Sequence, residues 1–266
     1  MRLAFLGAGK MATAIASGVV GNNVMQPADL IATDISPEAR TAFTEKTGVC
    51  CQESTSAMFA ECDALLLAVK PQMAEQAIAA LSRLKDDCLI ISIAAGIPIA
   101  KLSVWFKTGR IIRVMPNTPL MVGAGATVFA CGPGAHDEDA SFVTKLFGAL
   151  GYVAELPEEK IDAVTALSGS GPAYIFEMVQ ALTEGSVALG LPPDIALDLT
   201  VQTVYGAARM LRQRMGGPEE LRDAVTSPRG TTAAGLSVLA EGKFRTLIAA
   251  VVRAARDRSV ELGKLR

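Results

Sequence analysis

The chain has few of the side chains that usually carry acid–base or metal chemistry. Its single histidine, His136, ends the segment Cys131-Gly-Pro-Gly-Ala-His136, whose composition is typical of a solvated loop. None of the tyrosines, Tyr152, Tyr174 and Tyr205, is followed four residues later by a lysine, so the Tyr-x-x-x-Lys pair of the short-chain dehydrogenases is absent. No cluster of metal ligands is evident in the sequence, and we expect no metal site.

Features of secreted, membrane-spanning and nucleic-acid-binding proteins are also missing. No basic region precedes an apolar run at the N-terminus, and no stretch of about 18 residues is uninterruptedly apolar. The net charge is −2, which gives no basic surface for nucleic acid. We therefore expect a cytoplasmic protein with neither a membrane nor a nucleic-acid partner. The cysteines lack C-x-x-C spacing and are odd in number, which indicates reduced thiols at Cys50, Cys51, Cys62, Cys88 and Cys131.

Apolar residues, by contrast, are abundant. They make up 50% of the 266 residues, and the mean hydropathy is +0.35. This length allows one large or two ordinary domains. We interpret the apolar excess as surface that is buried between subunits.

The segment Leu3-Ala-Phe-Leu-Gly-Ala-Gly-Lys-Met-Ala12 organises the first half of the chain. A short apolar run predicts a buried strand, and Gly7, Gly9 and Ala12 then form Gly-x-Gly-x-x-Ala ahead of a helical pattern. In dinucleotide-binding folds, the first glycine allows a tight turn and the second lets the pyrophosphate approach the backbone. The helix start supplies free N–H groups to the phosphates. We favour cofactor binding here over a purely structural turn.

Strand-like and helix-like patterns alternate through the first 155 residues, which favours a doubly wound, mostly parallel sheet. We expect an α/β Rossmann domain over residues 1–157. Later strands are expected at residues 29–34, 64–69, 88–93 and 110–115, with late edge strands at 125–131 and 152–156; helices are expected at 37–46, 74–84 and 137–150.

After residue 157 no strand pattern is visible, and we expect an all-α domain over residues 158–266. Proline and glycine separate helices expected at residues 161–166, 172–189, 193–214, 218–225, 231–241 and 244–264. The helix from Pro172 is apolar on nearly every side, so it must be buried all round. A homodimer interface would bury it more readily than a small helical bundle, although the bundle stays open as an alternative.

The expected second strand ends at Asp34, 25 residues after Gly9. An acidic residue there usually accepts a hydrogen bond from the adenosine ribose, which favours NAD over NADP. Asp34 could instead be the N-cap of the next helix, and Ser36 and Arg40 could hold the 2′-phosphate of NADP. We therefore expect NADPH or NADH without choosing between them.

Two hydroxyl-rich loops stand out in the second half: Ser168-Gly-Ser-Gly-Pro172 and Val225-Thr-Ser-Pro-Arg-Gly-Thr-Thr232. The second loop presents hydroxyls and free N–H groups at a helix start, which suits a small carboxylate. Helix capping would explain one such hydroxyl, but not four. A protonated imine is a substrate that does not need a proton donor from the protein, because its carbon is already electrophilic. Thr232 could hydrogen-bond its nitrogen.

These residues resemble a known family, the Δ1-pyrroline-5-carboxylate reductases, over essentially the whole chain. The matching segments cover residues 5–12, 68–72, 92–96, 113–119, 161–174 and 225–232. The resemblance implies reduction of 1-pyrroline-5-carboxylate to L-proline with NAD(P)H, the last step of proline biosynthesis. It also implies a homodimer with active sites built by both subunits, often assembled into a decamer, a ring of five dimers.

The resemblance further assigns residues to the site. Thr232 would face the imine nitrogen as the catalytic residue. Substrate would contact Ser227, Gly230, Thr231, Thr232, Glu158 and Thr165. The cofactor would contact Gly7, Ala8, Gly9, Lys10, Met11, Asp34, Ala68, Val69, Lys70, Pro71, Ala94, Ala95, Gly96 and Asn117.

This sequence departs from the family at two positions. Arg229 stands where the family usually has Gly, so it is either strained or used to hold an anion. Asp34 stands where many members have a small hydroxyl residue.

Two other functions are compatible with a Rossmann half and a helical half. β-Hydroxyacid dehydrogenases use a lysine beyond the domain boundary and an asparagine four residues after it. The candidate lysine here is Lys160, and the residue four positions later is Val164, which makes this function the weaker alternative. A non-catalytic NAD(P)H sensor would keep the glycine motif without needing the hydroxyl loop.

Overall fold

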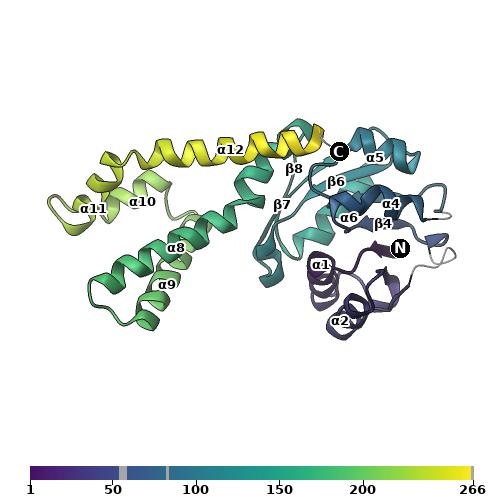
Figure 1. Ribbon diagram of the computed structural model, residues 1–266, viewed down its shortest axis with the longest axis horizontal. Coiled ribbons are helices and arrows are strands. Elements are labelled where there is room, and N and C mark those ends of the chain that lie inside the picture. The colour runs from purple at the N-terminus through teal and green to yellow at the C-terminus, as the bar shows by residue number, and fades with distance from the viewer. Residues whose placement is uncertain (54–58, 82–83, 265–266) are drawn as a thin grey trace. The chain divides into compact units, whose positions relative to one another are not determined.

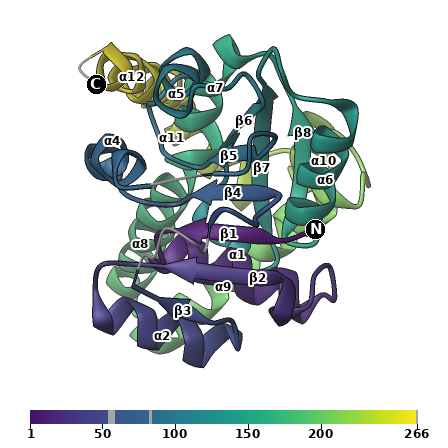
Figure 2. The ribbon, with the colours of Figure 1, turned by 90° about the vertical axis from the view of Figure 1, so that its right-hand side faces the viewer.

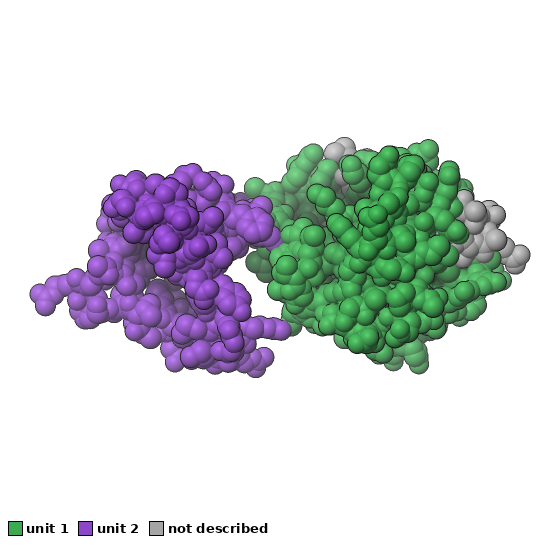
Figure 3. Space-filling view, turned by 90° about the horizontal axis from the view of Figure 1, so that it is seen from below, with its two compact units in different colours: residues 1–170, 254–266 green, residues 171–253 purple. Residues whose placement is uncertain are grey.

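The computed structural model describes residues 1–53, 59–81 and 84–264. It divides into two compact units (Figure 3): unit 1 is Met1–Ser170 with Ala254–Arg266, and unit 2 is Gly171–Arg253. The boundary expected between residues 157 and 158 stays a prediction, and unit 1 itself continues to Ser170. In the expected helix 74–84, Ser82 and Arg83 lie outside the described residues.

Unit 1 is built on a twisted sheet that has eight strands within the described residues, in the order β3-β2-β1-β4-β5-β6-β7-β8. Neighbouring strands are parallel except β6 and β7, which are antiparallel. This confirms the Rossmann-type fold class. The strands are β1 Leu3–Leu6, β2 Leu30–Thr33, β3 Cys51–Gln52, β4 Ala64–Leu67, β5 Leu89–Ser92, β6 Ile111–Met115, β7 Gly125–Cys131 and β8 Gly151–Glu155.

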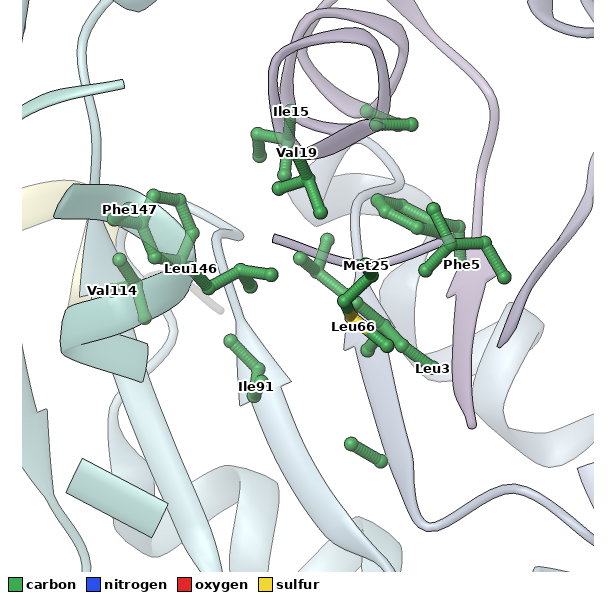
Figure 4. Packing of buried hydrophobic residues seen from close by; sticks show 14 of the residues in the cluster. Leu3, Phe5, Ile15, Val19, Met25, Leu66, Ile91, Val114, Leu146 and Phe147 are labelled. Atoms are coloured by element: carbon green, nitrogen blue, oxygen red, sulfur yellow. The ribbon is translucent and has the colours of Figure 1, made fainter. Parts of the chain in front are cut away.

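Helices cover both faces of this sheet (Figures 1 and 2), so its central strands are apolar on both sides. On one face lie α1 Lys10–Gly21, α2 Pro37–Thr47 and α6 Asp137–Gly148. Figure 4 shows how side chains of α1 and α6 meet those of the strands. On the other face lie α4 Ala74–Ala79, α5 Ile99–Phe106 and α7 Ile161–Val164. The strands β1, β4 and β5 are completely buried between these layers.

Three features of unit 1 were not predicted from the sequence. Strand β3 is only two residues long, and α5 was not assigned because it is short and begins directly after Pro98. Strand β7 is not an edge strand, because it lies between β6 and β8. It runs antiparallel to β6 because the short turn Thr118–Val122 is the only element between them, and a parallel strand needs a longer crossover.

Unit 2 is helical throughout its regular structure, with α8 packed against α9. Its helices are α8 Gly171–Ala188, α9 Pro193–Arg212, α10 Pro218–Ala224, α11 Thr231–Glu241 and the first half of α12 Phe244–Lys264. Among the described residues, no helix has the length and apolar character needed to span a membrane.

The helices of unit 2 leave most of their apolar side chains uncovered in a single chain. Phe176 is 67% exposed, Leu189 is 89% exposed, and Ala196 is the one apolar residue of unit 2 that is buried. Helix α8, which the sequence predicts to be buried all round, has no buried residue. A small internal bundle therefore does not bury it, and this surface requires another chain to cover it.

A largely buried ion pair joins β6 to α6 in unit 1. The Nε and Nη2 atoms of Arg110 donate to the two carboxylate oxygens of Asp139 at 2.9 and 2.8 Å. The N–H of His136, the exposed N-cap residue of α6, donates to the same carboxylate at 3.0 Å. Burial by itself would raise the pKa of Asp139, but the hydrogen bonds from Arg110 and His136 outweigh burial and lower it.

Replacing Asp139 with Asn should lower the stability at pH 7 by about 2–4 kcal/mol, because Arg110 loses its buried partner charge and keeps only its ion pair with the exposed Asp87. Since the folded-state pKa is depressed, this contribution is present above about pH 4 and is lost as pH falls through that pKa. Thermal unfolding midpoints of the two proteins, at one protein concentration, should differ at pH 7 and converge in acid. Asp137→Asn is the matched control, and a difference independent of pH would contradict the assignment.

Candidate active site

The carboxyl ends of β1, β4, β5 and β6 lie side by side in unit 1. Hydrogen bonds continue the ladder just past the strands: the Ala68 N–H donates to Leu6 O at 2.8 Å, and the Ile93 N–H donates to Leu67 O at 3.1 Å. This arrangement brings most of the expected cofactor residues to one edge of the sheet. They are Gly7, Ala8, Gly9, Lys10, Met11, Ala68, Val69, Lys70, Pro71, Ala94, Ala95, Gly96 and Asn117.

The turn after β1 has room for a cofactor on one side and none on the other. Gly7 has φ +103°, and a Cβ there would lie 2.9 Å from Val69 Cγ1 and 3.0 Å from the Ala68 carbonyl, so only glycine fits. A Cβ on Gly9 would meet nothing within 4 Å. Gly9 is also the N-cap of α1 and has no side-chain cap. An exposed helix start with this open approach fits a dinucleotide pyrophosphate.

Asp34 holds this turn in place. Its Oδ2 accepts from the Ala8 N–H at 2.8 Å, and its Oδ1 accepts from the Ser36 N–H at 2.9 Å. It is not the N-cap of α2, because the Ser36 hydroxyl accepts from the Ala39 N–H at 3.1 Å. The carboxylate at the end of β2 therefore positions the loop that would contact the pyrophosphate.

Arg40, the other residue proposed to hold a 2′-phosphate, is tied to the same strand end. Its Nη1 donates to the carbonyl oxygens of Asp34 and Ile35 at 2.8 and 3.2 Å. Ile35 itself is 84% exposed. Asp34 and Arg40, the two charged residues that could select between NADPH and NADH, thus lie at the same turn. Their contacts do not favour either nucleotide.

Asn117 connects the end of β6 to the segment that leads into the helical unit. Its Nδ2 donates to Ser168 O at 3.0 Å and its Oδ1 accepts from the Ala126 N–H at 2.8 Å. Ser168 belongs to a π-helical turn, Thr165–Gly169, in which the Thr165 hydroxyl donates to Ile161 O at 2.8 Å. Such turns are frequent at functional sites.

Glu158 has partners that the sequence did not predict. Its Oε1 accepts from the Ile99 N–H at 2.7 Å, at the start of α5, and from Nη1 of Arg113 at 3.0 Å. Only 9% of the Arg113 side chain is exposed, so Glu158 neutralises a buried charge. A lone arginine inside the apolar run Ile111–Met115 was the signal that could have predicted such a partner.

The expected substrate residues Ser227, Gly230, Thr231 and Thr232 lie in unit 2, at the start of α11. The Gly230 N–H donates to Ser227 O at 3.0 Å, which closes a four-residue turn with Pro228 in second place. Gly230 must be glycine, because a Cβ would lie 2.3 Å from Ser227 Oγ.

The hydroxyls of this loop are not used for capping. Gly230 is the N-cap of α11 and no side chain caps it, while Thr226 Oγ1 donates to Arg222 O at 2.6 Å. Within the described residues, the hydroxyls of Ser227, Thr231 and Thr232 have no hydrogen-bond partner. Three of the four hydroxyls are therefore free for a ligand.

Arg229 adopts φ +60° in this turn. A left-handed conformation costs a non-glycine residue about 1 kcal/mol. The position therefore does require a positive φ, as the family's usual glycine suggests.

The cysteines have no reactive thiolate among those whose pKa is clearly shifted. Burial is the main cause that raises the pKa of Cys88 and of Cys131 to about 12, and the pKa of Cys51 to about 11. These thiols are protonated at neutral pH and poor nucleophiles. None of the five cysteines forms a disulfide.

A mostly parallel sheet with a glycine turn at its carboxyl edge, followed by an apolar helical unit, is typical of dinucleotide-binding oxidoreductases. Residues 2–96 match the family model described as NADP oxidoreductase, coenzyme F420-dependent. Residues 158–262 match the model described as pyrroline-5-carboxylate reductase dimerisation. The chain thus carries a dimerisation region.

Similar proteins cover nearly the whole chain. A pyrroline-5-carboxylate reductase of Arabidopsis thaliana is 45% identical over 99% of this chain and 96% of its own length. One of Synechocystis is 40% identical over 99% of both. The solved structure of the Coxiella burnetii enzyme covers 98% of each chain at 36% identity with a TM-score of 0.90.

The Plasmodium falciparum pyrroline carboxylate reductase, solved with NADP bound, covers 99% of this chain and 98% of its own at 30% identity, with a TM-score of 0.89. The chain belongs to the pyrroline-5-carboxylate reductase family. The family expected from the motifs is confirmed, and with it an oxidoreductase that uses NAD(P)H as a non-covalent cofactor.

Asp34→Ala should weaken binding of NADH and NADPH together, by about 10-fold or more, because the Ala8 N–H loses a charged acceptor. Titration of each nucleotide by its fluorescence measures this without any substrate. Glu45→Gln removes an exposed carboxylate farther along α2 that has no hydrogen bond or ion pair within the described residues, and it should leave both affinities unchanged. Weaker NADH binding with tighter NADPH binding would instead make Asp34 a selector of the ribose alone.

Proposed function

We propose that this protein reduces 1-pyrroline-5-carboxylate to L-proline with NADPH or NADH. The observation that carries this proposal is near full-length similarity to reductases of that name, at up to 45% identity among those described above. The free hydroxyls of the 227–232 loop support it independently, since they suit a small carboxylated ligand.

The reaction suits a protein whose candidate site contains no evident general acid. The cyclic imine is protonated in water, so its carbon is already electrophilic and its nitrogen needs no proton from the protein. A nicotinamide cofactor, when bound, would supply the hydride for this carbon. The electron pair of the C=N bond moves to nitrogen, which keeps its own proton and becomes the secondary amine of proline.

The protein then has to bind and orient the substrate. The Thr232 hydroxyl holds the ring nitrogen, and Ser227, Thr231 and the free backbone N–H groups in the first turn of α11 hold the carboxylate. Glu158 and Thr165 are the other residues that the resemblance assigns to the substrate. The Glu158 carboxylate already accepts hydrogen bonds from Arg113 and from the Ile99 N–H at the start of α5, so its role is to position these groups.

The cofactor is held at the carboxyl edge of the sheet in a domain that spans residues 1–157. The substrate loop belongs to the helical domain, residues 158–266, of a homodimer. The uncovered apolar side chains of α8 support the dimer. Assembly of five dimers into a decamer, and a cytoplasmic location, remain predictions from the sequence.

Turnover measurements test the activity. The purified protein should oxidise NADPH or NADH when 1-pyrroline-5-carboxylate is added and should form proline in equal amount. A 2- or 3-keto acid should give no turnover. Turnover of the keto acid alone would favour a hydroxyacid dehydrogenase, and no turnover of either would favour a sensor.

Thr232→Ala should lower kcat/KM for the imine by about 10- to 100-fold, the scale of one directed hydrogen bond at the reacting centre. Nucleotide affinity should not change. Thr41→Ala is the control, because that hydroxyl donates to the Pro37 carbonyl in α2, outside the loop. Unchanged kinetics in Thr232→Ala would remove Thr232 from its role.

A further inference from the structure

The turn that carries Arg229 is one that normally requires glycine at that position. Ser227 O accepts from the Gly230 N–H at 3.0 Å, Pro228 is in second place, and Arg229 in third place has φ +60°. This is the pattern of a type II turn, in which glycine or asparagine is favoured in third place. The arginine side chain is therefore kept against the preference of the backbone.

Other left-handed residues of the chain have an ordinary structural reason. Among the described non-glycine residues, the positive φ values outside the loop belong to Asn23, Lys107, Arg214 and Lys243. Each directly follows a helix, α1, α5, α9 or α11, or its C-cap residue, where a left-handed residue commonly ends the helix. Arg229 instead precedes a helix, so helix termination does not explain it.

The charge of Arg229 is also uncompensated within the chain. The side chain is exposed, and within the described residues it has no hydrogen bond or ion pair. The first turn of α11 contains no acidic residue. A cation beside the start of a helix is disfavoured by the helix dipole. The backbone conformation of Arg229 is thus unfavourable in itself, and its charge is unfavourable unless an anion is bound nearby.

We propose that Arg229 binds the carboxylate of the cyclic imine and makes this enzyme selective for carboxylated imines. The proposal rests on the proposed function and adds one residue to its substrate loop. A guanidinium gives a carboxylate two parallel charge-assisted hydrogen bonds, which the hydroxyls of Ser227 and Thr231 cannot supply. Arg229 is thereby a specificity-determining residue, while Thr232 remains the residue at the reacting nitrogen.

The test compares two substrates that differ only in the carboxylate, 1-pyrroline-5-carboxylate and 1-pyrroline. Arg229→Gly should lower kcat/KM for the carboxylated imine by about 10- to 100-fold, mainly through KM. It should leave kcat/KM for 1-pyrroline unchanged. Its thermal midpoint should rise by a few degrees, about the effect of relieving a strained residue.

Two further variants separate charge from strain. Arg229→Asn relieves the turn without a charge and should behave like Arg229→Gly. Arg229→Lys keeps the charge without the fork of two N–H groups and should fall between the wild type and Arg229→Gly.

Arg214→Gly is the matched control, because it removes an arginine of the same backbone conformation in the same unit, with φ +55°. It should leave KM for both imines unchanged.

Product binding gives a readout without turnover. L-Proline should protect the wild type from thermal unfolding more than pyrrolidine does, and Arg229→Gly should reduce this difference. If the wild type reduces 1-pyrroline-5-carboxylate but Arg229→Gly has the same KM, or loses activity equally with 1-pyrroline, the role of Arg229 is refuted and the proposed function stands. A rise in KM for NADPH alone would assign Arg229 to the cofactor. A wild type that neither turns over the imine nor binds proline would refute both proposals.

Discussion

The close approach between the turn after β1 and the end of β4 is the constraint on which unit 1 depends. Gly7 lies so near Val69 and the Ala68 carbonyl that no side chain fits. This contact sets where α1 begins and therefore where its free N–H groups point. Asp34 fixes the other side of the same turn through the Ala8 N–H. Three neighbouring strand ends thus define the cofactor edge before any ligand is present.

The chemistry of the second unit depends on an opposite property, the lack of internal partners. The hydroxyls of the 227–232 loop are free within the described residues, and the large apolar side chains of α8 are uncovered. Exposed apolar surface of this kind marks an interface with another molecule, and the accessible hydroxyls are available to a ligand in exchange for water. A second chain would cover the apolar side chains, and a carboxylated ligand would bind the hydroxyls. Assembly and substrate binding therefore both involve groups that find no partner within the described residues of one chain.

Local patterns predicted most of this fold, and long-range contacts account for what they missed. The apolar runs at Leu3–Leu6 and Ala64–Leu67 and the glycines of the first turn gave the sheet and its ligand edge, because both depend on neighbours in sequence. The partners of Arg113 and Asp34 depend on residues brought together only by folding. The short α5 and the antiparallel β7 were missed because periodicity says little about elements of that length or about strand direction.

Unit 1 contains both ends of the chain, and this has a consequence for how the protein can be divided. The polypeptide leaves unit 1 at Ser170 and returns at Ala254, and Ser259 Oγ donates to Asp162 Oδ1 at 2.7 Å across that closure. The helical unit is topologically an insertion, although its family model begins at residue 158. Expressing the two sides of residue 158 as separate polypeptides would therefore divide unit 1 between two chains. Replacing only residues 171–253 with another domain would keep every residue of unit 1 in one polypeptide.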